Sequence, residues 1–424
     1  MDCRAALLAL CLIAARIAAQ DPCCDPWTDL GHALAGAGGA PQLQAIGSLA
    51  EDTQFVLDVQ GATPSALGWL FTGVNELSTG FKGGVLVPAP IDVVPLVTDS
   101  TGSVVLTGLW PAGSPQGSTF YAQFWVHDAS APKRFAASNA MLGLTPPPPP
   151  VAQFPADWIN GSHCDVDPLI QVQQCGENTW ILRQNKCVKI YDNFMFLFFG
   201  QDRAILFDTG AGGIPILDTV ESIMDGWLAA HGRASIPLVV AHTHAHADHI
   251  AGDPEFAGQP GVTLVGTTPA DVQAFFGFRD WPNDVVQFEL GGRTLDIVAT
   301  PGHEASHIAI YDHQTALLVT GDLLYPGYLF IPHAVSQGNF VQFQASTQRL
   351  VDFMADKPIA WIFGCHVEMK NTPFEAYPHL TEAQPDEHDP QLTRAQLLEL
   401  NAAVQAMSTP VYEVHADFII DPSD

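Results

Sequence analysis

Hydrophobic positions follow one pattern before residue 146 and another after residue 150. In the first part, short runs rich in β-branched and aromatic residues alternate with Gly, Pro, Asp and Ser, which is the rhythm of a β-sandwich. Strands are predicted over Phe55–Val59, Leu67–Phe71, Val85–Val87, Val93–Val97, Val104–Leu109, Thr119–Val126 and Phe135–Met141. We therefore expect a β-sandwich-like accessory module over residues 24–145.

The second pattern is one of strands alternating with helices, and it predicts an α/β domain over residues 151–424. Strands are predicted over Lys189–Phe199, Ala204–Phe207, Leu238–Ala241, Thr263–Val265, Val285–Phe288, Leu295–Ala299, Ile308–Tyr311, Ala316–Val319, Ala360–Phe363 and Val411–Ile420. Helices are predicted over Ile216–His231, Ala270–Phe276, Phe340–Met354 and Leu397–Val404. Five consecutive prolines, residues 146–150, predict a stiff linker of about 15 Å between the two domains.

The chain begins with features of a secretory signal peptide. Arg4 precedes an apolar run over Ala5–Ala15, and the small residues Ala18 and Ala19 lie near the expected cut site. We expect cleavage near Ala19, which defines residues 1–19 as the signal peptide; an uncleaved N-terminal anchor is the alternative. Because no later segment approaches the roughly 18 apolar residues of a membrane span, no stable membrane insertion is expected after cleavage. The expected location is secreted, periplasmic or at the cell surface.

Cleavage would leave an even number of cysteines, which suits an exported protein with disulfides. They are Cys23, Cys24, Cys164, Cys175, Cys187 and Cys365. Cys164, Cys175 and Cys187 are near one another in the sequence, so we expect at least one pair among them. The spacing leaves the pairing open.

The charge balance excludes some partners. Sixteen Lys and Arg face 45 Asp and Glu, which gives a formal net charge of −29. Such a surface repels polyanions, so nucleic acid and anionic membranes are disfavoured as partners and a small-molecule substrate is favoured. The chain also holds 16 His, as many as all its Lys and Arg together.

Histidine and aspartate concentrate just after predicted strands. The run after Leu238–Ala241 contains His242, His244, His246, Asp248 and His249. Later, His303, Asp322 and His366 each follow another predicted strand closely. So many imidazoles have little value in a hydrophobic core, because each must find a hydrogen-bond partner. Metal ligation explains both their type and their position at strand ends.

The motif His244-x-His246-x-Asp248-His249, together with Asp208 after a strand, His303, Asp322 and His366, resembles the metallo-β-lactamase superfamily. The resemblance covers about residues 180–370. It implies two β-sheets sandwiched between helices, with metals at one sheet edge. It also implies a first metal on His244, His246 and His303, a second on Asp248, His249 and His366, and a bridging Asp322. Asp208, His242 and His307 would support these ligands without binding metal.

The implied cofactor is two Zn²⁺ ions per chain, because imidazole and carboxylate ligands suit zinc. Iron or manganese would also accept such mixed ligands. Cys365 lies beside His366 and is interpreted as a buried neutral thiol, with ligation as the alternative.

The predicted reaction is hydrolysis of an ester, thioester, lactone or related bond. A hydroxide held between two ions is the expected nucleophile, and Asp248 is the candidate catalytic residue that passes a proton to the leaving group. Residues 300–307 and 321–325 look most like the hydroxyacylglutathione hydrolase type, although the C-terminal region lacks a cluster of Lys and Arg to hold an anionic substrate. Candidate substrate-binding residues are Tyr325, Tyr328, His333 and Lys370.

Two alternatives belong to other classes of protein. One is an iron-dependent redox enzyme on the same fold, either a diiron enzyme or a mononuclear-iron enzyme resembling sulfur dioxygenases. The other is a metal-stabilised surface-binding protein, in which the N-terminal module contacts a surface or a glycan.

Overall fold

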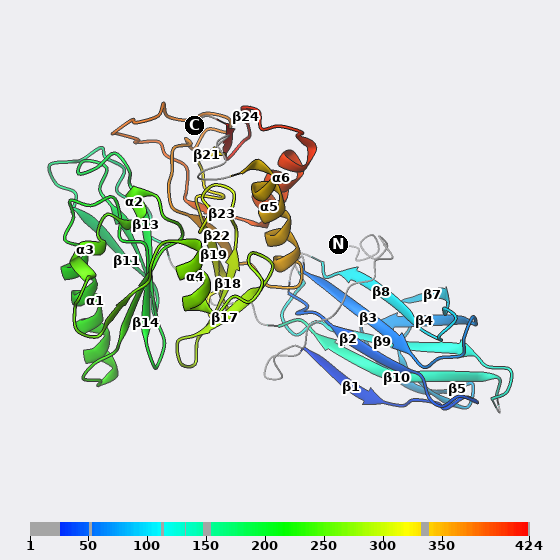
Figure 1. The fold of residues 1–424 in the computed structure, drawn as a ribbon. Helices are drawn as coiled ribbons and strands as arrows, with labels where there is room; N and C mark the ends of the chain where they lie inside the picture. Colours follow the sequence, from blue (N-terminus) through cyan, green and yellow to red (C-terminus); the bar gives the residue numbers. More distant parts are fainter. Residues whose placement is uncertain are drawn as a thin grey trace. The chain divides into compact units, whose positions relative to one another are not determined.

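The computed structural model describes residues 26–50, 53–111, 114–131, 133–146, 154–331 and 339–422. The chain divides into two compact units, Met1–Pro148 with Phe353–Pro358, and Pro149–Asp352 with Ile359–Asp424 (Figure 1). The predicted signal peptide, Cys23, Cys24, residues 147–150 of the proline run and His333 lie outside the described residues.

The first unit is an all-β sandwich. Its strands are β1 (Trp27–Gly31), β2 (Gln42–Ile46), β3 (Gln54–Gln60), β4 (Leu67–Gly73), β5 (Glu76–Phe81), β6 (Gly84–Pro88), β7 (Asp92–Val97), β8 (Val104–Leu109), β9 (Thr119–His127) and β10 (Phe135–Leu144). They form a five-stranded sheet of order β1-β10-β9-β4-β7, a three-stranded sheet of order β2-β3-β8 and the hairpin β5-β6. This architecture confirms the all-β sandwich predicted before the α/β domain.

Strand β9 is buried on both faces, and the alternation of its side chains explains why. Phe120 and Phe124 point into a core shared with β2, β3 and β8. On the opposite face, Trp125 packs against Leu86 and Phe81 of the β5-β6 hairpin. The hairpin therefore covers the apolar outer face of the five-stranded sheet.

The second unit contains two six-stranded sheets. The first, of order β11-β12-β13-β14-β15-β16, consists of β11 (Ile170–Gly176), β12 (Thr179–Gln184), β13 (Phe194–Phe199), β14 (Ala204–Phe207), β15 (Leu238–Ala241) and β16 (Val262–Leu264). The second, of order β17-β18-β19-β20-β22-β23, consists of β17 (Val285–Glu289), β18 (Thr294–Ala299), β19 (Ile308–Asp312), β20 (Leu317–Gly321), β22 (Trp361–Gly364) and β23 (Gln391–Leu392). A small third sheet has the order β21-β25-β24, with β21 (Tyr328–Phe330), β24 (Glu413–Val414) and β25 (Ile419–Asp421).

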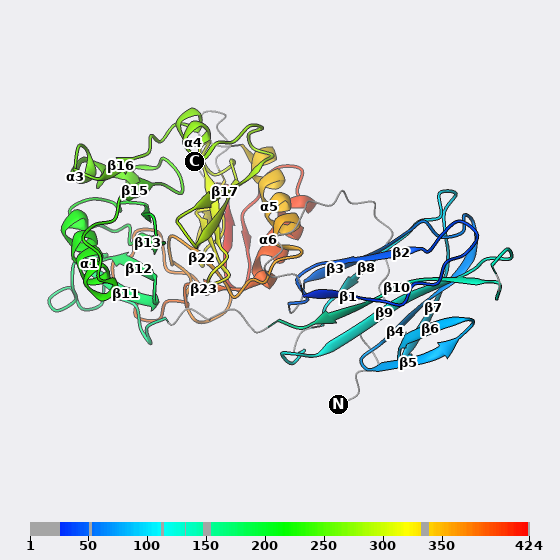
Figure 2. The ribbon, with the colours of Figure 1, turned by 90° about the horizontal axis from the view of Figure 1, so that it is seen from below.

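Helices lie on or beside both six-stranded sheets. They are α1 (Ile216–His231), α2 (Ala247–Ile250), α3 (Asp253–Phe256), α4 (Pro269–Phe276), α5 (Phe340–Met354) and α6 (Arg394–Ala406). Figure 2 shows α1 beside the first sheet, and α5 and α6 on the far side of the second sheet. The second unit is thus the helix–sheet–sheet–helix sandwich that the sequence predicted.

Strand β13 shows how the sequence builds these layers. Phe194, Phe196 and Phe198 point inward and pack against residues of the second sheet. Met195 and Leu197 point outward into the cluster that contains α1. A strand buried on both faces needs an unbroken apolar run, and the sequence Phe-Met-Phe-Leu-Phe-Phe provides one.

The predictions for β14, β15 and α1 are confirmed with the predicted bounds. Helix α1 ends where Gly232 takes a left-handed conformation and its N–H bonds the helix carbonyls. The prediction for Lys189–Phe199 was too long, because β13 begins only at Phe194. The single strand predicted over Val411–Ile420 is wrong, since that segment forms the separate strands β24 and β25.

Cys164 and Cys187 form a disulfide with a Cα–Cα distance of 5.5 Å, while Cys175 and Cys365 are buried free thiols. The bond ties the segment before β11 to the connection between β12 and β13. That connection leads directly into Asp192 and Asn193, which lie at the site described below. No helix among the described residues has the length and apolar character needed to cross a membrane.

Removing the disulfide should destabilise the second unit. The double variant Cys164→Ser/Cys187→Ser should lose about 2–4 kcal/mol of unfolding free energy, because the bond closes a loop of 23 residues. Urea denaturation under non-reducing conditions measures this loss, and reduced wild-type protein is the control. Equal stability of the variant and the oxidised wild type would contradict the stabilising role given to the disulfide between Cys164 and Cys187.

Candidate metal centre

One end of the two central sheets collects the predicted ligands. Asp208 follows β14, and the histidine-rich run over residues 242–249 follows β15. Asp322 comes directly after β20, and His366 lies two residues after β22. His303 lies in the loop that follows β18. Because the ends of these strands meet at one edge of the sandwich, residues far apart in sequence converge there.

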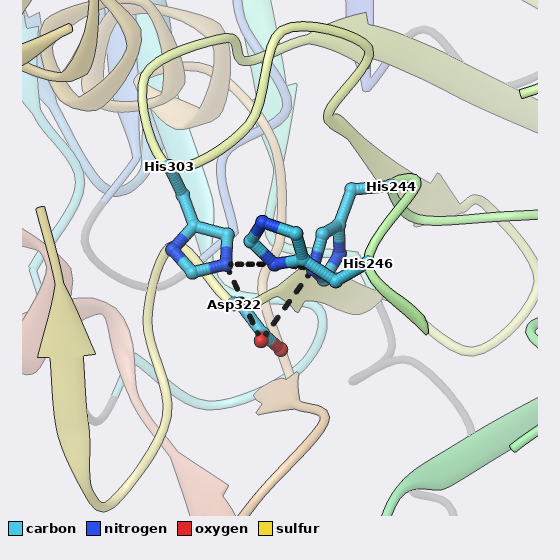
Figure 3. A group of neighbouring side chains, drawn as sticks. All are labelled: His244, His246, His303 and Asp322. Carbon is cyan, nitrogen blue, oxygen red and sulfur yellow. Dashed lines mark hydrogen bonds and ion pairs between the residues drawn. The ribbon is translucent and has the colours of Figure 1, made fainter. Parts of the chain in front are cut away.

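The first group of ligand atoms comes from His244, His246, His303 and Asp322 (Figure 3). The Nδ1 atom of His246 lies 2.9 Å from His244 Nε2 and 3.0 Å from His303 Nε2. Asp322 Oδ2 lies 3.6 Å from His244 Nε2 and 3.5 Å from His303 Nε2. Donor atoms bound at about 2.0–2.2 Å to one zinc ion have separations of this size.

The second group contains Asp248, His249 and His366, and it shares Asp322 with the first. Asp248 Oδ2 lies 3.5 Å from His249 Nε2 and 3.4 Å from His366 Nε2. Asp322 Oδ2 lies 3.4 Å from each of the same two nitrogens. One carboxylate oxygen therefore faces four imidazoles, two from each group.

The donor set fits two divalent cations. Asp322 is only 5 % exposed, yet its Oδ1 atom has no hydrogen-bond partner among the described residues. A buried carboxylate without compensation is costly, and a cation supplies that compensation. The first group offers three nitrogens and one oxygen, and the second offers two nitrogens and two oxygens; both sets suit zinc.

Two histidines of the first group, His244 and His303, are held in the neutral form. Burial lowers the pKa of His303 to about 4, and burial also lowers the pKa of His244 well below its ordinary value. A neutral imidazole offers the lone pair that a metal requires. These two side chains are therefore in the protonation state of ligands.

The second group attracts positive charge. Burial disfavours the charged forms of His249 and His366, but Asp322 and the neighbouring carboxylates outweigh burial and raise both pKa values well above the ordinary value. For Asp248 and Asp322, burial alone would raise the pKa. The nearby His249 and His366 outweigh burial and hold the pKa of both carboxyls below the usual range. A divalent cation would satisfy the same carboxylates without protonating the histidines.

Asp208 orients the second group from behind. Its carboxylate accepts hydrogen bonds from Thr243 N at 2.7 Å, Thr243 Oγ1 at 2.8 Å and His249 Nδ1 at 2.9 Å. The last bond keeps the proton on Nδ1 and leaves His249 Nε2 free for a metal. Asp208 has a φ of 68°, a left-handed conformation that Asp tolerates better than most residues. The structure therefore places Asp208 where the sequence prediction expected it.

Backbone groups hold His303 and Asp322 in place. The Nδ1 atom of His303 donates to the carbonyl of Phe330 in β21 at 2.8 Å. The backbone N–H of Asp322 donates to His307 Nε2 at 3.1 Å, and the other ring nitrogen of His307 lies 2.8 Å from Thr300 Oγ1. His307 thus contacts the backbone of a ligand, as a supporting residue should.

His242 and Cys365 contact acidic side chains that are not among the seven predicted ligands. His242 Nε2 lies 2.8 Å from Asp253 Oδ1, so this side chain ties the end of β15 to α3 and not to a ligand side chain. Cys365 Sγ lies 3.5 Å from Asp208 Oδ2, and burial raises the pKa of its thiol to about 12. At neutral pH this thiol is protonated, which is the neutral state expected from the sequence.

The sequence prediction missed a buried charged network beside His366. Arg183 forms ion pairs with Asp192 and Glu387, and Lys186 Nζ lies 3.0 Å from Asp192 Oδ1. The same Asp192 oxygen lies 3.9 Å from His366 Nδ1. Asp192 therefore lies on the Nδ1 side of His366, as Asp208 does for His249, but at ion-pair distance and not at hydrogen-bond distance. Its neighbour Asn193 was missed as well.

Three of the candidate substrate-binding residues are described, and each is engaged within the protein. The buried Tyr325 donates its hydroxyl to the carbonyl of Tyr328, and its ring centroid lies 5.4 Å from that of His366. Tyr328 donates its hydroxyl to the carbonyl of Tyr377 at 2.9 Å. Lys370 Nζ lies 3.1 Å from Glu375 Oε2.

Comparison with known sequences agrees with this geometry. The sequence model of the Metallo-beta-lactamase superfamily matches residues 191–366, which include all seven predicted ligands. This part of the chain therefore has the fold and the ligand motif of the metallo-β-lactamase superfamily.

Relatives among curated proteins include hydroxyacylglutathione hydrolases. The one from Methylococcus capsulatus is 29% identical over 164 residues, which are 38% of this chain and 57% of that protein. The one from Xylella fastidiosa is 31% identical over 164 residues, 38% of this chain and 55% of that protein. The one from Ectopseudomonas mendocina is 34% identical over 104 residues, 24% of this chain and 38% of that protein. The chain thus spans about half the length of these relatives, or less.

Solved structures similar to this chain include a metallo-beta-lactamase from Pontibacter korlensis, with 18% identity and a TM-score of 0.38 over 56% of this chain and 100% of that one. Another is a metallo-beta-lactamase from Hirschia baltica, with 16% identity and a TM-score of 0.35 over 47% of this chain and 91% of that one.

Replacing Asp208 should weaken metal binding. The variant Asp208→Ala removes the acceptor that holds His249 and Thr243, so metal affinity should fall by about 10–100-fold. Competition with a chelator measures the affinity, and Asp225→Ala, an exposed change in α1, is the control. Metal affinity equal to that of the control would contradict the role given to Asp208.

Proposed function

We propose that this protein is a binuclear metal-dependent hydrolase that cleaves a thioester, ester, lactone or related acyl bond. The observation that carries the proposal is the position of Asp322 Oδ2, which lies 3.4–3.6 Å from four imidazole nitrogens belonging to two separate ligand groups. A carboxylate in that position is suited to bridge two ions. The likeness to hydroxyacylglutathione hydrolases supports hydrolysis as the reaction.

The proposed ligands would be divided between the two ions according to the group to which each side chain belongs. His244, His246 and His303 would hold the first ion, Asp248, His249 and His366 would hold the second, and Asp322 would contact both. When bound, two divalent ions supply Lewis-acid polarisation of a carbonyl oxygen and lower the pKa of a water molecule to about 7. Zinc is the favoured metal because the donors are imidazoles and carboxylates, while iron and manganese are the outcomes that metal analysis would reveal instead.

Substrate would approach from the side of the loop over residues 245–248. Its residues are half-buried or exposed, whereas His244, His249, His303 and His366 are buried. Asp248 lies on this open side and keeps its proposed role of passing a proton to the leaving group. A leaving group that departs through the open side would pass this carboxylate.

The charge of the chain favours a small substrate without many negative charges. The formal net charge is −29, and Lys370 is already paired with Glu375. Phosphate-rich substrates such as nucleic acids need basic residues that this chain does not offer in number. A small acyl compound is therefore the substrate class that we propose.

Removing the shared carboxylate should abolish both metal loading and catalysis. Asp322→Ala should lower thioester hydrolysis by at least ~100-fold and reduce the bound metal below two ions per chain. Asp248→Ala and His246→Ala should also lose turnover while the protein remains folded, as circular dichroism would verify.

These losses are measured with a panel of thioesters, esters, lactones and β-lactams as substrates. The metal content of the same samples is determined in parallel. Chelation of wild-type protein should abolish activity, and added Zn²⁺ should restore it. Asp225→Ala is again the control. Wild-type rates in Asp322→Ala would refute the proposed reaction, and iron with oxygen consumption would replace it by redox chemistry.

We further propose that the protein is exported, which accords with the signal-peptide pattern of residues 1–19. The disulfide between Cys164 and Cys187 supports this, because such bonds persist in oxidising compartments. Among the described residues of the first unit, no group of three or more His, Cys, Asp or Glu side chains could hold a metal. Contact of that module with a surface or a glycan stays a prediction.

Export can be tested on the mature chain. Expression of the full sequence in a secreting bacterial host should yield protein outside the cytoplasm whose N-terminus lies near Gln20, as N-terminal sequencing would show. A cytoplasmic product that retains Met1 would contradict export.

A further inference from the structure

Asn193 lies at the second ligand group, although no prediction or comparison singles it out. It is the last residue before β13, which runs antiparallel to β14 with Phe196 opposite Phe207. This register puts the start of β13 beside the end of β14, where Asp208 stands. Asn193 is fully buried, so its amide has no access to bulk water.

The side-chain amide of Asn193 points at three proposed ligand atoms at once. Its Nδ2 atom lies 3.2 Å from Asp248 Oδ2, 3.1 Å from His249 Nε2 and 3.4 Å from His366 Nε2. These separations resemble the 3.4–3.5 Å between the ligand atoms themselves. Donors at about 2.0–2.2 Å from one ion have such mutual distances. The end of the amide therefore lies where a further donor to the same ion would lie.

The orientation of the amide decides what it contributes. The ring of His249 turns its Nδ1 toward Asp208, and the ring of His366 turns its Nδ1 toward Asp192. In the metal-bound state both Nε2 atoms would present lone pairs to the centre of the group. An NH₂ group suits the Asp248 carboxylate 3.2 Å away, but a cation at that centre requires an oxygen. The two ends of an Asn amide have nearly the same shape, and a half-turn exchanges them.

The oxygen of this amide has no other use among the described residues. Asn193 Oδ1 is buried and makes no hydrogen bond, and a buried acceptor without a partner is unusual in folded proteins. We propose that Asn193 binds the second metal ion through Oδ1, with its amide turned by a half-rotation relative to the orientation described above. The inference rests on the proposed binuclear centre.

This ligand would make the two positions chemically different. The first position keeps three imidazoles and one carboxylate. The second would have two imidazoles, two carboxylates and one amide oxygen, so oxygen donors would outnumber nitrogen donors. Oxygen-rich sites favour harder ions such as Mn²⁺ relative to sites dominated by imidazole. The second position should therefore be the weaker zinc site and the one that exchanges first.

Titration of the full-length apoprotein with Co²⁺ tests the inference, because each equivalent is followed by its visible absorption without any activity measurement. Wild-type protein should bind two equivalents. Asn193→Ala should keep the first equivalent and bind the second at least ~10-fold more weakly, with a changed spectrum for that equivalent. Asn178→Ala is the matched control, since the Asn178 amide accepts a hydrogen bond from Trp227 in the same unit and contacts no ligand.

The variant Asn193→Asp separates an oxygen ligand from a structural N–H donor. A carboxylate offers oxygen at the same corner, so Asn193→Asp should bind the second equivalent at least as tightly as wild type. If the amide served only as a donor to Asp248, the added carboxylate would repel Asp248, and Asn193→Asp would bind the second equivalent more weakly than wild type does. That order of affinities would overturn the inference, even if Asn193→Ala failed to fold.

The remaining outcomes are also distinct. Two equivalents with unchanged affinity and spectrum in Asn193→Ala would overturn the role of Asn193 and leave the binuclear centre intact. A single equivalent in the wild-type protein would overturn the binuclear centre and the Asn193 inference together.

Discussion

The buried carboxylate of Asp322 is the group on which both halves of the site depend. It comes directly after β20, and one of its oxygens faces imidazoles that arrive from β15, β18 and β22. A buried negative charge must be compensated. The residues at the surrounding strand ends must therefore supply either positive charge or the ligands of a metal ion. Gly321 permits this arrangement, because a side chain there would come within 2.6 Å of the His307 ring that holds the Asp322 backbone.

Much of this arrangement follows from the sequence, for a physical reason. Strands buried on both faces are mostly apolar runs, so β14, β15 and β20 stand out and the polar residues just after them are marked as site candidates. Strand β12 escaped prediction because it carries Arg183 and Gln184, which look exposed in the sequence. They are buried because Asp192 and Glu387 pair with Arg183, and because Gln184 bonds backbone groups around Gly212.

Asp192 and Asn193 were missed for a related reason. The apolar run that ends at Phe199 was extended back to Lys189, which hid both residues inside a predicted strand. They in fact precede β13. In an antiparallel pair, the start of one strand lies beside the end of its neighbour, so residues before β13 belong to the same edge as Asp208. Residues at such a site can therefore come from the start of a strand as well as from the end of one. The hydrophobic pattern alone does not reveal which strands are paired antiparallel.

The central claim is that one carboxylate serves two metal ions, and a crystal of the zinc-loaded protein tests it most directly. Anomalous scattering measured at the zinc absorption edge should reveal two peaks, one on each side of Asp322 Oδ2. One peak should lie among His244, His246 and His303, and the other among Asp248, His249 and His366. A single peak, or two peaks that do not share Asp322, would contradict the account.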